Sequence, residues 1–326
     1  MFESDHKTPT VAVVIPAYRA RSTVLDVIQR VGATVSLIYV IDDGCSEETG
    51  SAVERDCSDT RVQVLKNKVN LGVGGAMKRG YEAALKDGAD IIVKIDADGQ
   101  CWPELIPELI YLITIGASDY VKGNRLLSPE AVQTMPKGRL FGNLALSFAT
   151  KISSGYWHIM DPTNGLTAIS AKIWRLLPAE KISDRYFFES DMLFRLGVLG
   201  ARVHDLPMVA VYGEERSSLA IKDIVWPFLR GLVKNSAKRI VYKYFIQDFN
   251  MGSLYLILGL ANLVFGGIVG VSYWAEGVSS NQYVSPGRVM LAAMPVLLGF
   301  QLLLNFLAFD MAGDNGRRIH FYQDMQ

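Results

Sequence analysis

Carboxylates and an amide alternate in one short segment whose spacing could bind a metal ion. Asp96, Asp98 and Gln100 directly follow the apolar run Ile91–Ile95. Alternate side chains of an extended segment project to one side, so the two carboxylates could converge. Oxygen ligands of this kind suit Mg²⁺ or Mn²⁺ that bridges to phosphate oxygens. The alternative, a solvated turn, is less favoured because the segment follows an apolar strand.

Two further segments could contact a nucleotide. Asp42 and Asp43 end a second apolar run, where a carboxylate could accept hydrogen bonds from a ribose or a base edge. The segment Asn70–Ala76 contains Gly72 and Gly74 and opens a helix, where backbone amides could meet phosphate oxygens. A turn-forming aspartate and an ordinary glycine turn remain the plain alternatives.

Five isolated charged residues between positions 125 and 216 could complete a site that binds a metal and a nucleotide. Arg125, Arg139 and Arg216 carry planar guanidinium groups that suit phosphates, or they are surface charges. Asp161 opens an Asp-Pro-Thr-Asn-Gly turn, and Asp191 lies at the start of an expected helix that opens with Glu189. These two acids could cap local structure or face the site, and the sequence leaves both open.

Strand and helix patterns alternate along the first half of the chain. The expected strands are Val11–Ile15, Ser36–Ile41, Val62–Leu65, Ile91–Ile95 and Tyr120–Lys122, and the expected helices are Val24–Val31, one opening near Ser46, Gly74–Leu85 and one opening at Trp102. This alternation predicts a mostly parallel sheet with helices on both faces. Ligands bind beyond the carboxyl ends of such strands, where the acidic segments fall.

Composition narrows the classes of protein. The 326 residues hold 33 Lys and Arg and 33 Asp and Glu, so a general nucleic-acid binder is not expected. Three cysteines, Cys45, Cys57 and Cys101, argue against a disulfide framework or a zinc site. The polar start of the chain predicts no signal peptide.

Two uncharged stretches near the C-terminus predict membrane helices, at about 251–274 and 289–309. Each is long enough to cross a hydrocarbon core, which takes about 20 helical residues. A buried hairpin in a soluble core is the alternative. Basic residues precede the first stretch and follow the second, so we expect a multi-pass cell-membrane protein with both termini in the cytoplasm.

Three regions result from these patterns. We expect a cytosolic catalytic domain at 1–216, a basic amphipathic juxtamembrane segment at 217–250 and two membrane helices with a short cytoplasmic tail at 251–326. The middle segment interleaves apolar and basic residues, which is typical of helices in the membrane interface. A connector that packs on the catalytic domain is the alternative.

The ordered motifs together resemble family 2 inverting glycosyltransferases with a GT-A fold, in the polyprenyl-phosphate (dolichol-phosphate mannose synthase-like) branch. The matching runs are VVIPAY at 13–18, IDDG at 41–44, NLGVGGAMKRG at 70–80, DADGQ at 96–100, GNR at 123–125, DPTNG at 161–165 and GEERSS at 213–218. The likeness covers nearly the whole chain. It implies a Rossmann-like sheet, a sugar nucleotide as donor and a polyprenyl phosphate as acceptor.

The resemblance also implies roles for individual residues. The donor nucleotide sugar would contact Pro16, Ala17, Tyr18, Asp42, Asp43, Gly72, Gly74, Asp96 and Ala97. Mg²⁺ or Mn²⁺ would be bound by Asp96, Asp98 and Gln100. The residues at the reacting groups would be Asp98, Asp161, Asp191, Arg125, Arg139 and Arg216, with the arginines on phosphates and Asp161 and Asp191 near the sugar.

These expectations converge on a metal-dependent transfer of one sugar from a UDP- or GDP-sugar to a polyprenyl phosphate. Extension of a lipid-linked saccharide at a sugar hydroxyl is the second reading, and it would require a carboxylate base, for which Asp161 and Asp191 are the candidates. A non-catalytic scaffold or nucleotide-sugar sensor is a third. The sequence leaves the donor and self-association open.

Overall fold

The computed structural model describes residues 8–208 and 221–313. Two compact units divide the chain, one reaching Ser236 and the other spanning Ala237–Asp314. The division falls inside the segment 217–250 for which the sequence predicts a juxtamembrane region. The two units are described separately below.

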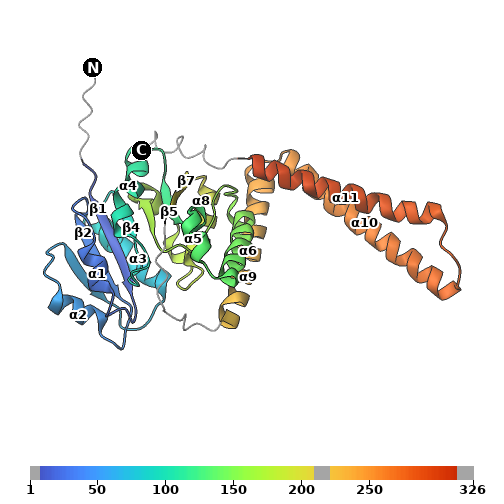
Figure 1. Cartoon of the computed structure of the whole chain (residues 1–326). Coiled ribbons are helices and arrows are strands. Elements are labelled where there is room, and N and C mark those ends of the chain that lie inside the picture. Colours follow the sequence, from blue (N-terminus) through green and yellow to red (C-terminus); the bar gives the residue numbers. More distant parts are fainter. Residues whose placement is uncertain (1–7, 209–220, 314–326) are drawn as a thin grey trace, which may run out of the picture. The chain divides into compact units, whose positions relative to one another are not determined.

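A seven-stranded sheet forms the centre of the first unit (Figure 1). Its strands are β1 (Val11–Ala17), β2 (Leu37–Asp42), β3 (Val62–Lys66), β4 (Ile91–Lys94), β5 (Tyr120–Asn124), β6 (Thr167–Ser170) and β7 (Val203–Pro207). Their spatial order is β3-β2-β1-β4-β6-β5-β7. Only β6 runs antiparallel to its neighbours, β4 and β5, so the predicted mostly parallel sheet is confirmed.

Helices and short turns connect the strands. The α-helices of this unit are α1 (Val24–Gln29), α2 (Thr49–Asp56), α3 (Val73–Lys86), α4 (Ile106–Thr114), α5 (Pro129–Thr134), α6 (Lys137–Ser154), α7 (Ala171–Leu176) and α8 (Phe188–Leu199). Three 3₁₀ turns accompany them: η1 (Pro103–Leu105), η2 (Arg125–Leu127) and η3 (Ala179–Lys181). The helix α9 (Ile221–Val241) begins in this unit and ends in the second.

Both faces of the sheet are buried, which explains why β1 is apolar at successive positions rather than alternating. Val11, Val13 and Ile15 pack on one face into a core shared with α1 and α4. Ala12 and Val14 pack on the other face into a core shared with α3, α7 and α8. Strands buried on both faces read as continuous apolar runs.

The register of the central strands brings three carboxyl ends to one edge. Ala17 at the end of β1 pairs with Asp42 at the end of β2, and Val14 pairs with Lys94 at the end of β4. The acidic segments that follow β2 and β4 therefore start from the same edge of the sheet.

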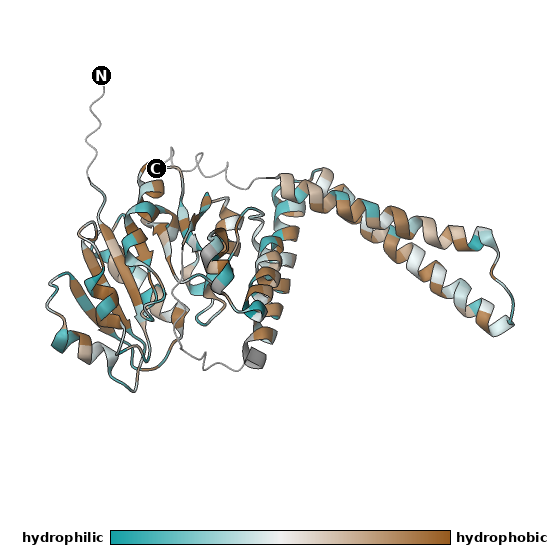
Figure 2. Ribbon diagram, in the orientation of Figure 1, coloured by the Kyte–Doolittle hydropathy of each residue, from teal (hydrophilic) through white to brown (hydrophobic). Residues whose placement is uncertain are grey.

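The second unit is a helical hairpin joined to the end of α9. It contains the π-helical segment η4 (Tyr242–Gln247), α10 (Met251–Ser280) and α11 (Pro286–Ala312). Both long helices are apolar enough to cross a membrane by length and composition, and Figure 2 shows hydrophobic residues along both. They pack closely because Gly259 faces Gly299: a Cβ added at Gly299 would lie 2.8 Å from the Gly259 carbonyl oxygen.

A buried ion pair joins the last turn of α9 to the last turn of α11. The guanidinium of Arg239 donates to both carboxylate oxygens of Asp310, at 2.8 and 2.7 Å. The hydroxyl of Tyr244 donates to the same carboxylate at 2.7 Å. Because each charged group has a hydrogen-bonded partner, both can be buried at this point.

Substituting Gly197 with Ala should destabilise the first unit. A Cβ at Gly197 in α8 would overlap the carbonyl oxygen of Ser154 at the end of α6. Forcing a methyl group into such a contact costs about 1–3 kcal/mol. We expect a lower midpoint of thermal unfolding, whereas Gly138→Ala, where nothing lies within 4 Å of the added Cβ, should match the wild type. Equal midpoints for both variants would show that α6 and α8 are not packed as described.

Candidate active site

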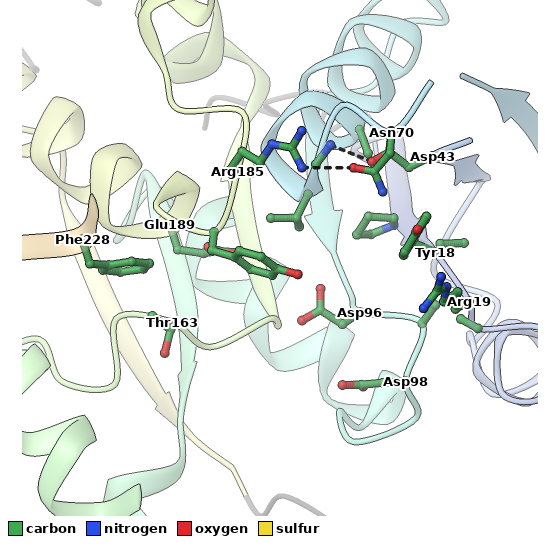
Figure 3. Close-up of a pocket in the computed structure, with 18 of the residues that line it drawn as sticks. Tyr18, Arg19, Asp43, Asn70, Asp96, Asp98, Thr163, Arg185, Glu189 and Phe228 are labelled. Atoms are coloured by element: carbon green, nitrogen blue, oxygen red, sulfur yellow. Dashed lines mark hydrogen bonds between the residues drawn. The ribbon is translucent and has the colours of Figure 1, made fainter. Parts of the chain in front are cut away.

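A pocket of about 1250 Å³ opens at the carboxyl edge of β1, β2 and β4. The residues of its polar end come from the end of β1, from the loops after β1, β2, β3 and β4, from the turn before β6, and from the start of α8 and the segment before it (Figure 3). They include Pro16, Ala17, Tyr18, Arg19, Asp43, Asn70, Gly72, Asp96, Ala97, Asp98, Thr163, Arg185 and Glu189. The structure thus brings together most of the residues for which the sequence predicts nucleotide contacts.

Asp96 points into this pocket, and its carboxylate forms an ion pair with a buried lysine. The ammonium of Lys94, whose side chain is 1% exposed, lies 2.5 Å from Asp96 Oδ1 and 3.2 Å from Glu189 Oε1. Burial lowers the pKa of Lys94, but the two carboxylates outweigh it and raise the pKa above its usual value. The pair Asp96 and Glu189 therefore shares one permanent positive charge.

Glu189 is the pocket-facing acid of α8. Burial raises the pKa of Glu189, with Asp96 adding to the rise and Lys94 opposing it. Figure 3 shows its side chain on the opposite wall from Tyr18, with Asp96 between them. Its place at the start of α8 and its contact with Lys94 make it a candidate functional residue.

Asp96 and Asp98 fit the requirements of a magnesium-type site. Both line the pocket, and Asp98 Oδ1 accepts a hydrogen bond from the backbone amide of Gln100 at 3.0 Å. No group of three or more His, Cys, Asp or Glu suited to a metal occurs among residues 8–208 and 221–313. Two carboxylates are nevertheless a sufficient protein contribution where substrate phosphates and water supply the other ligands. Coordination of a metal by Asp96, Asp98 and Gln100 stays a prediction.

Asp43 organises the glycine-rich loop. Its carboxylate accepts hydrogen bonds from the amides of Leu71 at 2.9 Å and Gly72 at 2.7 Å, and from the Asn67 side chain at 2.7 Å. These amides are therefore engaged with a carboxylate. Asp43 lines the pocket, so it could both hold the loop and contact a ligand.

Asp42 occupies a different environment from its neighbour. Its two oxygens accept hydrogen bonds from the backbone amides of Cys45, at 3.0 Å, and Gly50, at 2.7 Å. The residue is buried and is not part of the pocket lining. Direct contact with a nucleoside stays a prediction for this residue.

Gly72, just before α3, and Gly74, in the first turn of α3, allow the segment before α8 to approach closely. A Cβ at Gly74 would overlap the Ser183 carbonyl oxygen, and one at Gly72 would lie 2.6 Å from the Asp184 carbonyl oxygen. The Gly75 amide donates to that Asp184 oxygen at 3.0 Å. This packing brings Arg185 to the pocket, where its guanidinium lies 3.4 Å from Asn70 Oδ1.

Three of the residues predicted at the reacting groups are engaged in buried polar contacts. Arg125 donates to both oxygens of Asp161, at 2.7 and 2.6 Å, and Asp161 is fully buried. Asp191 accepts hydrogen bonds from the Ser183 amide at 3.0 Å and the Asn235 side chain at 2.9 Å. None of the three is part of the pocket lining. Their predicted contacts with substrate stay predictions.

The two remaining predicted arginines are not placed in the pocket. Arg139 is an exposed residue of α6 and is not part of the lining. Arg216 lies outside the described residues. Their roles stay predictions.

The other end of the pocket is apolar and is built by two helices. From α6 come small and aliphatic residues, and from α9 come larger apolar residues: Gly142, Ala145, Leu146, Ala149, Val225, Phe228, Leu229 and Leu232. The sequence analysis did not predict that these residues or Arg185 line a pocket. The weak signal available was the small-residue spacing of α6 and the apolar positions of α9.

Relatives with assigned activities align with somewhat less than two thirds of the chain. An N-acetylglucosaminyltransferase of Methanococcus voltae, named for UDP-N-acetylglucosamine and dolichyl phosphate, is 29% identical over 62% of this chain and 86% of its own. An undecaprenyl-phosphate mannosyltransferase of Micrococcus luteus is 31% identical over 63% of this chain and 84% of its own.

Solved structures agree with the fold. Mannosyl-3-phosphoglycerate synthase of Rubrobacter xylanophilus has a TM-score of 0.54 at 18% identity, over 74% of this chain and 77% of that one. Glucosyl-3-phosphoglycerate synthase of Mycobacterium tuberculosis, in complex with Mn²⁺ and UDP, has a TM-score of 0.51 at 20% identity, over 71% and 80%. The glycosyl transferase family 2 profile matches residues 12–177, half of the 326-residue chain. The chain therefore belongs to glycosyl transferase family 2.

Proposed function

We propose that this protein transfers one sugar from a nucleotide diphosphate sugar to a polyprenyl phosphate at the membrane surface. The observation that carries the proposal is a single pocket with carboxylates and arginines at one end and an apolar wall at the other. A polar donor and an acceptor with a phosphate head and a hydrocarbon tail would together match these two ends. The relatives named for dolichyl and undecaprenyl phosphates support the same acceptor class.

The donor would occupy the polar end. Its nucleoside would lie against Pro16, Ala17 and Tyr18 at the end of β1, where sheets of this kind bind ligands. Its diphosphate would lie toward Asp96 and Asp98. A divalent ion bound there by the two carboxylates would neutralise charge on the leaving diphosphate.

The acceptor would enter from the apolar end. Its first hydrocarbon units would lie between the small side chains of α6 and the aromatic ring of Phe228 on α9. Its phosphate would then meet the sugar near Thr163 and Glu189. Arg185 is the pocket-lining cation from the α8 side that could balance phosphate charge on this wall.

The reaction requires no strong base from the protein. An ionised oxygen of the acceptor phosphate attacks the anomeric carbon, and the bond from that carbon to the donor diphosphate breaks with inversion. The electron pair of that bond leaves with the nucleoside diphosphate. A phosphate monoester has a second pKa near 6, so the attacking oxygen is largely ionised at neutral pH. Positioning of the two substrates would then supply much of the rate.

The helical hairpin would hold this chemistry at the membrane. We propose that α10 and α11 cross the cell membrane, because their lengths and compositions suit a hydrocarbon core. The basic residues of α9, with few in the connecting loop, favour a cytoplasmic catalytic domain and cytoplasmic termini.

A direct assay tests the proposed reaction. The full chain in detergent is supplied with undecaprenyl phosphate, Mg²⁺ or Mn²⁺ and a panel of UDP- and GDP-sugars. We expect nucleoside diphosphate release together with a lipid whose mass has increased by one sugar.

Asp98→Asn should lower turnover at least 100-fold while leaving the unfolding midpoint unchanged, because it removes a charge that faces the donor. Near wild-type turnover of this variant would show that Asp98 is not a metal ligand.

The hydroxyl-acceptor reading has one specific observation in its favour, the pocket-facing carboxylate of Glu189. The substitution Glu189→Gln separates the two readings. With a phosphate acceptor we expect kcat to stay within about tenfold of wild type. A general base contributes about 10²–10⁴-fold, so a loss of that size would favour a hydroxyl acceptor. The matched control is Glu104→Gln, which removes an exposed acid paired with Arg30.

For Arg125 and Asp161 we propose that the buried pair supports the pocket wall. Hydrogen bonds and charge from Arg125 outweigh burial and lower the pKa of Asp161 to about 2. Stability from this carboxylate is therefore present above its unfolded pKa of about 4 and is lost as pH falls toward 2. Asp161→Asn should cost about 3–5 kcal/mol at pH 7, because it leaves Arg125 buried without a charged partner.

Unfolding midpoints measured between pH 7 and pH 3 check this expectation. The loss caused by Asp161→Asn should shrink toward the acid end, because the carboxylate of the unfolded wild-type chain becomes protonated at a higher pH than that of the folded chain. Asp26→Asn is the control, because Asp26 forms an exposed ion pair with Arg30 at 3.6 Å and should change stability little. A wild-type midpoint for Asp161→Asn at pH 7 would contradict the supporting role.

A further inference from the structure

We infer that the outer face of α11 is a self-association surface, on which the amides of Gln301 and Asn305 hydrogen-bond to a second copy of this chain. The inference goes beyond the transfer reaction and rests only on the proposal that α10 and α11 cross the membrane. It begins from two amides one turn apart, an exposed Gln301 and a half-buried Asn305, with Gln301 Nε2 donating to Asn305 Oδ1 at 3.3 Å.

This pair lies on the side of α11 that faces away from α10. Gly299 marks the inner side, because a Cβ there would lie 2.8 Å from the Gly259 carbonyl oxygen of α10. At about 100° per residue, Gln301 is rotated about 200° from Gly299 and Asn305 about 240°. Within the hairpin, both side chains therefore project outward.

Both residues also lie inside α11, with Asn305 7 residues, about 10 Å, before Ala312. Gln301 follows Pro286 by 15 residues and precedes Ala312 by 11 residues. At about 1.5 Å per residue, it is about 16 Å from the nearer end of α11. The surrounding outer face is apolar, with Leu297 67% and Leu298 53% exposed. A membrane-crossing α11 would thus hold two amides at hydrocarbon depth.

Two other polar side chains of the hairpin bond to backbone carbonyl oxygens of their own helix. Asn262 donates to the Leu258 carbonyl oxygen at 2.8 Å, and Ser272 donates to the Ile268 carbonyl oxygen at 2.8 Å. The amides of Gln301 and Asn305 together carry four N–H donors and two oxygen acceptors, and their mutual bond uses one of each. Unsatisfied amides in hydrocarbon are costly, which favours bonds across helices.

A second copy is the partner whose chemistry fits. Copies inserted in the same orientation are related by an axis along the membrane normal, so two α11 helices can meet side by side with equal depths. Gln301 and Asn305 then face the same two residues of the other copy. Each amide offers both a donor and an acceptor, so identical pairs complement one another.

The test measures association in lipid and requires no substrate. Full-length chains labelled at the C-terminus with donor or acceptor dyes are reconstituted in phosphatidylglycerol–phosphatidylethanolamine vesicles over a range of protein-to-lipid ratios. We expect energy transfer that falls on dilution. The double variant Gln301→Leu and Asn305→Leu should weaken the dimer about tenfold or more, and Asn262→Leu should behave as wild type.

Cysteine crosslinking locates the surface. Leu298→Cys should give a copper-phenanthroline dimer in vesicles, whereas Ile268→Cys on the exposed side of α10 and the parent chain should not. A monomeric wild type at all densities, or an unchanged dimer constant in the double variant, would overturn the inference. So would association that appears only with a different membrane protein. None of these outcomes bears on sugar transfer, which is assayed separately.

Discussion

The buried ammonium of Lys94 is the charge on which the arrangement of the candidate site depends. It lies between Asp96, which the loop after β4 supplies, and Glu189, which α8 supplies from the other side of the pocket. A buried charge is tolerated only when it is paired, so the three side chains constrain one another. Gly165 completes the constraint, because a Cβ there would overlap the Asp96 carboxylate. The position of one metal-type carboxylate is thus fixed jointly by β4, α8 and the turn before β6.

The second constraint is the close approach of two backbone segments, the glycine-rich loop and the segment before α8. It gives the glycines of the loop a packing role. Glycines before a helix suggest phosphate binding, yet here Gly72 and Gly74 make room for the carbonyl groups of Ser183 and Asp184. The amide of Gly72 bonds to Asp43 instead of remaining available. The loop thereby docks the segment that delivers Arg185 and Glu189. A ligand in the pocket would therefore contact the side chains of Arg185 and Glu189 more directly than it would contact the backbone amides of the loop.

The sequence was sufficient for strands β1 to β5 and for the polar edge of the pocket, but it did not predict β6 or β7. Apolar runs ending in acidic segments predict parallel strands whose carboxyl ends meet, and Asp43, Asp96 and Asp98 do line one pocket. It was insufficient where partners lie far apart in the chain. Arg125 and Asp161 are separated by 36 positions, and nothing local indicates that they pair in the interior. The pocket-facing role of Glu189 depends on Lys94, which reads in sequence as an ordinary polar end to a strand.

Some carboxylates are hydrogen-bonded within the protein and others face the pocket, and this difference bears on the choice of acceptor. Asp161 and Asp191, the bases that a hydroxyl acceptor would need, each hold several hydrogen bonds within the protein. Glu189 faces the pocket but shares the charge of Lys94 with Asp96. A lipid phosphate brings its own ionised nucleophile, so it makes the smallest demand on these side chains. An apolar wall beside the carboxylates is then what such an acceptor requires, since its tail must be covered while its phosphate reaches the sugar.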